Sequence, residues 1–172
     1  MNWTKSISKI LFLLSIAFLA NKYAYSQIAE IESKIPKNVP IKIELKNQDS
    51  VDWVHDLEII VTNTGKKPIY FLFLSLVLDV KAEDGNFRGF SLLYGNKNLY
   101  STEGLAEEND SSIQPNKTYT FKINKNSADA WTYRNAQENF VQPRTAQLKL
   151  GWLSFGDGSG IKGGGTIYVK KQ

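Results

Sequence analysis

Two polar loops hold the residue types from which a metal-binding or catalytic site is built. The first is the glycine-rich segment 155–165, FGDGSGIKGGG, in which Asp157 and Ser159 offer oxygens at alternate positions. Glycines let backbone carbonyls turn inward, so the segment has the residue types of a calcium loop. Calcium takes about six to eight oxygen ligands, however, and only one carboxylate is local. The sequence therefore favours a hairpin loop whose positive-φ positions need glycine.

The glycines of this segment also match a dinucleotide-binding spacing. Gly158, Gly160 and Gly163 stand in the pattern G-x-G-x-x-G. A dinucleotide fingerprint leads from a strand into a helix, whose N-terminus holds the pyrophosphate. Here the glycines lead into Thr-Ile-Tyr-Val at 166–169, which predicts a strand. The spacing therefore does not indicate a nucleotide site.

The second loop, 52–56, reads DWVHD and contains the chain's only histidine. His55 with Asp52 or Asp56 has the residue types of a base with its orienting acid, or of two metal ligands. The sequence shows no third ligand and no nucleophile, and a site requires convergent groups. We therefore predict no catalytic residue, no metal and no cofactor. The two loops supply four binding candidates: Asp157, Ser159, Trp53 and His55.

Aromatic side chains offer a different kind of binding surface. Six of them could form a sugar-stacking platform, although core packing is favoured for most of them. They are Trp53, Tyr94, Tyr100, Trp131, Tyr133 and Trp152. A row of such rings on the surface would favour a glycan ligand. A protruding loop without such a row would favour a protein partner.

The elements that position these residues are mostly strands. Alternating or continuous apolar patterns predict strands at 39–45, 57–63, 69–80, 90–94, 118–123, 146–155 and 166–169. A helix is predicted over 128–139, with Ser127 as its cap and Trp131 and Phe140 on one face. No βαβ alternation occurs, so a parallel sheet is not expected. The pattern predicts an all-β fold, an antiparallel immunoglobulin-like β-sandwich of seven or eight strands with one short crossover helix.

The long strand 69–80 has one apolar face and one mixed face. The mixed face carries Ile69, Phe71 and Phe73, and a patch of this kind is seldom left exposed without use. It could be covered by the predicted helix, through Trp131 and Phe140, or by a second copy of the chain. The helix is favoured, because a tethered element loses less entropy than a free partner.

Three further expectations concern local structure. Ser75, near the middle of the strand 69–80, could mark a bulge or a change of partner sheet. Alternation along 146–155 places Leu148, Leu150 and Trp152 on one side of that strand. The polar segment 27–38 is expected to form a short helical turn or a loose edge.

The first 26 residues have the pattern of an export signal. Lys5 and Lys9 precede an apolar run at 10–20, and its eleven residues fall short of the about 20 that a membrane span needs. Small residues at Ala24 and Ser26 predict cleavage before Gln27. The expected mature chain, 27–172, is one domain without a membrane span.

Net charge and cysteine content limit the cellular locations and the classes of partner that we expect for the protein. Residues 1–26 hold three lysines and no acid, so their removal lowers the net charge from +4 to +1. This removes the case for a nucleic-acid partner. The absence of cysteine excludes a disulfide framework and cysteine chemistry. We expect a secreted or periplasmic bacterial protein with an unknown protein or glycan partner.

Three stretches resemble a group of uncharacterised secreted bacterial immunoglobulin-like proteins with a C-terminal FGDG-G signature. They are VTNTGKKPIYF at 61–71, SIQPNKTYTFKI at 112–123 and GWLSFGDGSG at 151–160. FGDGSG also resembles the WDFGDG signature of polycystic-kidney-disease-type sandwich repeats. The first stretch is similar to the BsuPI-type proteinase inhibitor domain, another sandwich. None of these resemblances supplies catalytic residues.

The function predicted from the residues and the resemblances together is binding. We expect an exported, non-catalytic binding or structural module. The alternative is a secreted inhibitor or a carbohydrate-binding accessory protein, and an enzyme is not expected.

Overall fold

A computed structural model of the chain describes residues 30–81, 85, 87–101, 104–137, 143 and 145–169. The predicted export signal lies outside these residues. The described residues form nine strands in two sheets, and nearly all strand pairs are antiparallel. This confirms the all-β sandwich, with more strands than the seven or eight expected. The immunoglobulin-like connection of the strands stays a prediction.

The larger sheet holds six strands. Five are ordered β5-β4-β7-β8-β9, and β1 pairs with β7 beside this path. Their bounds are Glu30–Ser33 (β1), Phe71–Lys81 (β4), Phe87–Gly95 (β5), Thr145–Ser154 (β7), Ser159–Lys162 (β8) and Ile167–Val169 (β9). β1 runs parallel to β7, from Glu30 opposite Thr145 to Ser33 opposite Leu148. The expected loose edge at 27–38 is therefore in part a parallel strand.

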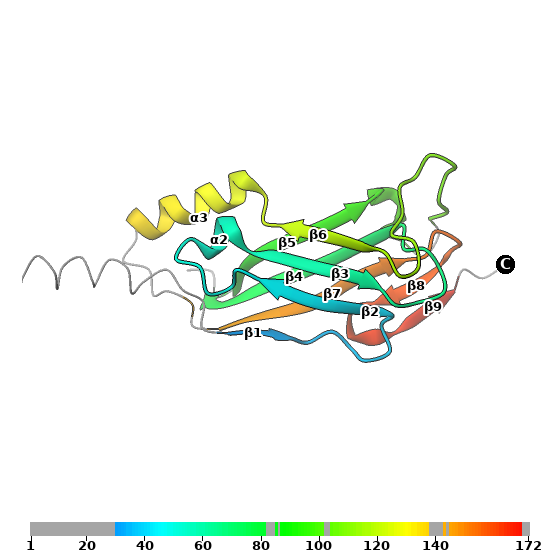
Figure 1. The fold of residues 1–172 in the computed structure, drawn as a ribbon, viewed down its shortest axis with the longest axis horizontal. Coiled ribbons are helices and arrows are strands. Elements are labelled where there is room, and N and C mark those ends of the chain that lie inside the picture. The colour runs from blue at the N-terminus through cyan, green and yellow to red at the C-terminus, as the bar shows by residue number, and fades with distance from the viewer. Residues whose placement is uncertain are drawn as a thin grey trace, which may run out of the picture.

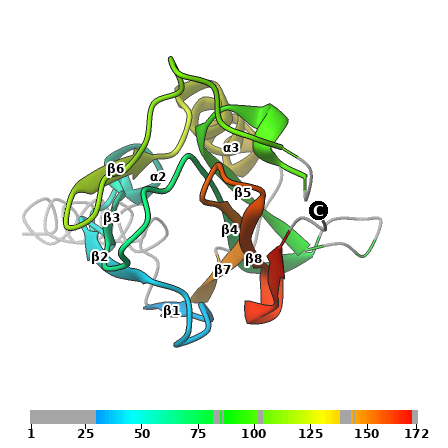
Figure 2. The ribbon, with the colours of Figure 1, turned by 90° about the vertical axis from the view of Figure 1, so that its right-hand side faces the viewer.

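The smaller sheet is ordered β2-β3-β6 and faces the larger one (Figure 2). Its strands are Ile41–Lys46 (β2), Glu58–Asn63 (β3) and Thr118–Lys122 (β6). β3 turns Ile59 and Val61 into the core, at 1% and 0% exposure, as its alternating sequence predicts. The inward residues of β4 that meet them from the other sheet are Leu72, Leu74, Leu76 and Leu78.

Four short helical elements complete the described chain. They are Trp53–Asp56 (α2), Lys97–Leu99 (η1), Lys125–Gln137 (α3) and Gly163–Gly165 (η2). α3 and β1 lie on opposite sides of the gap between the two sheets (Figures 1 and 2). α3 therefore closes one side of the sandwich, where Ala128 and Trp131 are buried.

The predicted crossover helix is present, but it begins earlier than expected. Asn124 caps it, because its side-chain oxygen accepts the backbone N–H of Asn126 at 3.0 Å and its carbonyl accepts that of Ala128 at 2.9 Å. Ser127, the predicted cap, lies inside the first turn. Phe140 falls outside the described residues.

Candidate functional site

The FGDGSG segment forms the hairpin between β7 and β8. Gly156 and Gly158 have φ of 75° and 80°, and the Phe155 N–H donates to the Ser159 carbonyl at 3.0 Å. These are the positive-φ positions that the sequence predicted for glycine. The chain then turns through η2 into β9, a strand, which contradicts the helix that a dinucleotide fingerprint requires.

The carboxylate of Asp157 is engaged by protein groups. Lys67 Nζ lies 2.7 Å from Asp157 Oδ2, and both the backbone N–H and the hydroxyl of Ser159 donate to Oδ1. Burial alone raises the pKa of the Asp157 carboxyl, but the hydrogen bonds from Lys67 and Ser159 outweigh it and hold the pKa below its ordinary value. Asp157 and Ser159 therefore fasten the hairpin to the turn that carries Lys67.

That turn is itself held by a buried asparagine. The Asn63 side-chain amide donates to the carbonyls of Lys67 and Ile113 at 2.9 and 2.8 Å, and its oxygen accepts the N–H of Gly65 at 2.9 Å. All three polar requirements of the buried amide are met within the protein. The VTNTGKKP stretch thus works as a rigid support for the Lys67–Asp157 ion pair.

The other two sequence candidates lie in α2, which Figure 1 places at the opposite end of the sandwich from β8. Trp53 is only 1% exposed and contacts Phe90 edge-on, with ring centroids 6.2 Å apart. Trp131 of α3 also contacts Phe90, with ring centroids 5.9 Å apart. We call Trp53, Phe90 and Trp131 the buried cluster. Trp53 is therefore a core residue, with almost no surface open to a ligand.

His55 links two elements that are distant in the sequence. Its Nδ1 lies 2.7 Å from Asp52 Oδ1, and its Nε2 lies 3.0 Å from Asp129 Oδ1 on α3. The hydrogen bond to Asp52, followed by that to Asp129, raises the pKa of His55 above its ordinary value. Because both ring nitrogens face carboxylates, neither is available to take a proton from a substrate. Among the described residues, no group of three or more His, Cys, Asp or Glu could hold a metal ion.

A different set of residues forms an open surface on the outer face of the larger sheet. We call Phe71, Phe73, Tyr100 and Trp152 the outer cluster. Tyr100 lies centrally, with its ring 5.9 Å from Phe71, 6.0 Å from Phe73 and 5.2 Å from Trp152. Phe71 is 1% exposed and forms the base of the cluster, whereas Tyr100 is 54% exposed.

The outer cluster borders a hollow of about 310 Å³, which we call the aromatic groove. Apolar side chains form most of its wall, and Leu93 is 43% exposed there. Its lining is Phe71, Phe73, Ser91, Leu93, Lys97 and Tyr100. Lys162 Nζ lies 5.1 Å from the indole of Trp152 and 5.8 Å from the ring of Tyr168.

The expected cover of this face by Trp131 of the helix is wrong, and the other expected contact, Phe140, lies outside the described residues. Phe71 and Phe73 contact Tyr100, which follows η1, while Trp131 of the helix packs against Phe90 in the buried cluster. Phe90 is paired with the inward residue Leu76, so Trp131 lies on the inner side of the sheet. The helix therefore cannot use Trp131 to cover the outer face.

A bulge explains why Trp152 joins the outer cluster. Phe73 is opposite Trp152, whereas the next residue, Leu74, is opposite Leu150, so Gly151 is the extra residue in β7. An ideal Cβ on Gly151 would lie 2.3 Å from a carbon of the Phe73 ring. The bulge reverses the parity of β7, so Trp152 and Leu150 face opposite sides instead of sharing one. Ser75, the expected bulge position, keeps regular pairing with both neighbours.

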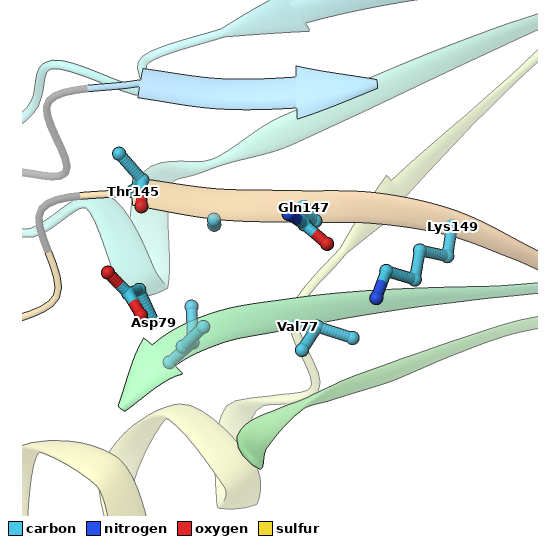
Figure 3. Close-up of a pocket in the computed structure, with 7 residues that line it drawn as sticks. Val77, Asp79, Thr145, Gln147 and Lys149 are labelled. Atoms are coloured by element: carbon cyan, nitrogen blue, oxygen red, sulfur yellow. The ribbon is translucent and has the colours of Figure 1, made fainter. Parts of the chain in front are cut away.

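The other half of the outer face is polar. Figure 3 shows the side chains of β4 and β7 around a smaller hollow, of about 220 Å³. Val77 and Asp79 of β4 lie there with Thr145, Gln147 and Lys149 of β7. None of the described residues that line this hollow is aromatic. The outer face thus changes along the same strands from aromatic to polar.

The chain matches no protein family, no curated protein and no solved structure. Within the part of the chain that the structure describes, no helix is both long and apolar enough to cross a membrane.

Proposed function

We propose that the protein is an exported, non-catalytic binding module that holds a glycan in the aromatic groove. The observation that supports this proposal is the partly exposed outer cluster. Tyr100, at 54% exposure, and Leu93, at 43%, stand beside a hollow that their side chains do not fill. Apolar patches of this kind on a soluble protein are typically used for recognition.

The chemistry of the groove suits a sugar ring. A pyranose has apolar C–H faces and a rim of hydroxyls, so it needs aromatic faces and a few hydrogen-bonding groups together. Tyr100 and Phe73 offer the aromatic surface, while Ser91 and Lys97 line the same hollow with a hydroxyl and an ammonium. The described residues that line the groove include no carboxylate or histidine.

The second candidate, an inhibitor that presents a protruding loop, is less well supported. The segment 104–112 is tied down: the Ala106 N–H donates to the Gly156 carbonyl at 2.7 Å, and Leu105 bridges Asp157. Asn96 also donates to Asp110 at 3.0 Å. These contacts hold the segment 104–112 against the end of the sandwich that carries the aromatic groove.

Affinity electrophoresis through gels that contain starch, xylan, dextran or polygalacturonate tests the glycan proposal. Retardation by at least one polymer is expected. Tyr100→Ala should weaken it by about tenfold, the effect of losing roughly 1.4 kcal/mol of ring contact. Tyr133, which is 67% exposed on α3, provides the matched control, and Tyr133→Ala should bind normally. Equal effects of the two variants, or no retardation by any polymer, would remove the support for this function.

Export is a separate part of the proposal. It rests on the charged and apolar pattern of residues 1–26, which predicts a secreted or periplasmic protein that begins at Gln27. The intact mass of protein recovered outside the cytoplasm tests it. A mass that includes residues 1–26 would contradict the cleavage.

A further inference from the structure

A second hollow lies between the edge strand β5 and the helix α3. It has a volume of about 450 Å³, and we call it the arginine groove. β5 forms one edge of the larger sheet, and α3 runs beside it (Figures 1 and 2). The lining residues are Arg88, Gly89, Phe90 and Ser91 from β5, and Ser127, Ala130, Trp131 and Arg134 from α3.

The lining is cationic. Arg88 and Arg134 come from elements far apart in the sequence and converge on one hollow, with the hydroxyls of Ser91 and Ser127 beside them. None of the described residues that line the groove carries a carboxylate. The acid of α3 that the structure describes, Asp129, is engaged elsewhere, because its oxygens contact His55 at 3.0 Å and Lys125 at 2.7 Å.

The spacing along α3 explains this separation of charge. Ser127, Ala130 and Arg134 follow the three- and four-residue steps that keep side chains on one helix face, together with Trp131. Asp129 falls off that row, towards α2. The helix therefore presents one positive charge and one hydroxyl to β5, and its carboxylate to His55.

The two grooves adjoin. Ser91 lines both the aromatic groove and the arginine groove. Leu93, two residues further along β5, faces the aromatic groove, and Arg88 faces the arginine groove. A chain-like ligand held in the aromatic groove can thus continue along the edge of β5 to the guanidinium groups.

We propose that the glycan is anionic, with its sugar faces on the outer cluster and a carboxylate or sulfate group in the arginine groove. This inference rests on the proposed function and names the class of glycan. Guanidinium groups form short, charge-assisted and often bidentate hydrogen bonds with such oxyanions. The serine hydroxyls can donate to the remaining acceptor oxygens.

Polymers that differ only in charge test the inference. The probes are polygalacturonate against its methyl-esterified form, and dextran sulfate against dextran. The charged member should bind about tenfold more tightly at low salt, and the difference should shrink as salt rises. A preference for polygalacturonate alone identifies a carboxylate as the recognised group, and a preference for dextran sulfate alone identifies a sulfate.

A matched pair of variants locates the charge effect. Arg134→Gln, at an exposed position, should weaken binding of the charged polymer about five- to tenfold and leave its neutral counterpart unchanged. Lys149→Gln removes one positive charge from the polar half of the outer face and should bind normally. Thermal unfolding of both variants checks that they are folded.

The outcomes separate this inference from the proposed function. Tyr100-dependent binding that is equal for charged and neutral polymers overturns the inference and leaves the function in place. Arg134-dependent binding of the charged polymer that ignores Tyr100→Ala overturns the aromatic site and supports the arginine groove alone. Tighter binding of a single-stranded oligonucleotide than of any polysaccharide overturns both.

Discussion

The buried cluster and the outer cluster contain similar residues in different surroundings. Trp53 contacts Phe90 edge-on, at 77°, and Phe73 contacts Tyr100 at the same angle. The buried cluster lies where α2 and α3 meet the sheets, so it is enclosed from several directions. The outer cluster lies on one sheet, where, among the described residues, Tyr100 after η1 packs over Phe71 and Phe73. Ring geometry is therefore the same in the buried and the partly exposed cluster, and what differs is how many elements enclose the rings.

The largest effect is expected at the base of the outer cluster. Phe71→Ala should destabilise the monomer by about 3–5 kcal/mol, because Phe71 is 1% exposed and its removal leaves a cavity under Tyr100. Tyr100→Ala is the control, and it should cost far less because half of that side chain is exposed. Chemical denaturation measures both.

One result would remove the difference between the buried cluster and the outer cluster. If Phe71→Ala leaves stability unchanged but converts a dimer into a monomer in sedimentation, a second copy covers the outer cluster. The outer cluster would then be enclosed like the buried one, and the glycan proposal would lose its exposed surface.

A smaller effect is expected at the bulge. Gly151→Ala should cost about 1–3 kcal/mol, because the new Cβ lies too close to the Phe73 ring. In the background of Phe73→Ala the same substitution should cost clearly less, since the ring is gone. A double-mutant cycle in denaturant gives this coupling. Equal costs in both backgrounds would mean that Gly151 is required by the backbone and not by the ring.

The sequence predicts much of the fold through alternation, and the exceptions have physical causes. The β3 pattern correctly turns Ile59 and Val61 inward. The β7 pattern fails at Trp152, because one extra residue at Gly151 reverses the side of every residue after it. A glycine in the middle of a strong strand was the available signal for this bulge.

The site was harder to predict than the fold. Asp157 and His55 stood out by residue type, yet their partners, Lys67 and Asp129, are 90 and 74 residues away. Only the folded structure shows that Lys67 binds Asp157 and that Asp129 binds His55. Tyr100 was named among six aromatic candidates, but its exposure depends on η1 holding it above β4. Sequence periodicity carries no information about such loop positions.

The smallest effect is expected at the end of the sandwich that carries α2 and α3. It tests whether this end and the end that carries the β7–β8 hairpin are stabilised independently. The pKa of His55 is raised above its unfolded value of about 6.5 by Asp52 and Asp129. Protonated His55 therefore stabilises the fold fully below about pH 6.5, and this contribution is lost as the pH rises through the folded pKa. Asp129, whose pKa is lowered first by Lys125 and then by His55, loses its contribution only in acid.

Thermal unfolding between pH 6 and 9 measures this effect. The native protein should show a fall in melting temperature over this range. His55→Gln keeps a hydrogen-bonding side chain without the titration, so it should flatten this fall. The change should be modest, because the His55 side chain is 29% exposed and water screens its ion pairs. Asp157→Asn, in the β7–β8 hairpin, should lower the melting temperature at every pH. It should leave the slope of melting temperature against pH unchanged, since a carboxyl with a lowered pKa does not titrate between pH 6 and 9. If His55→Gln and the native protein have the same slope, α2 and α3 are held by the buried cluster alone and the ion pair contributes nothing.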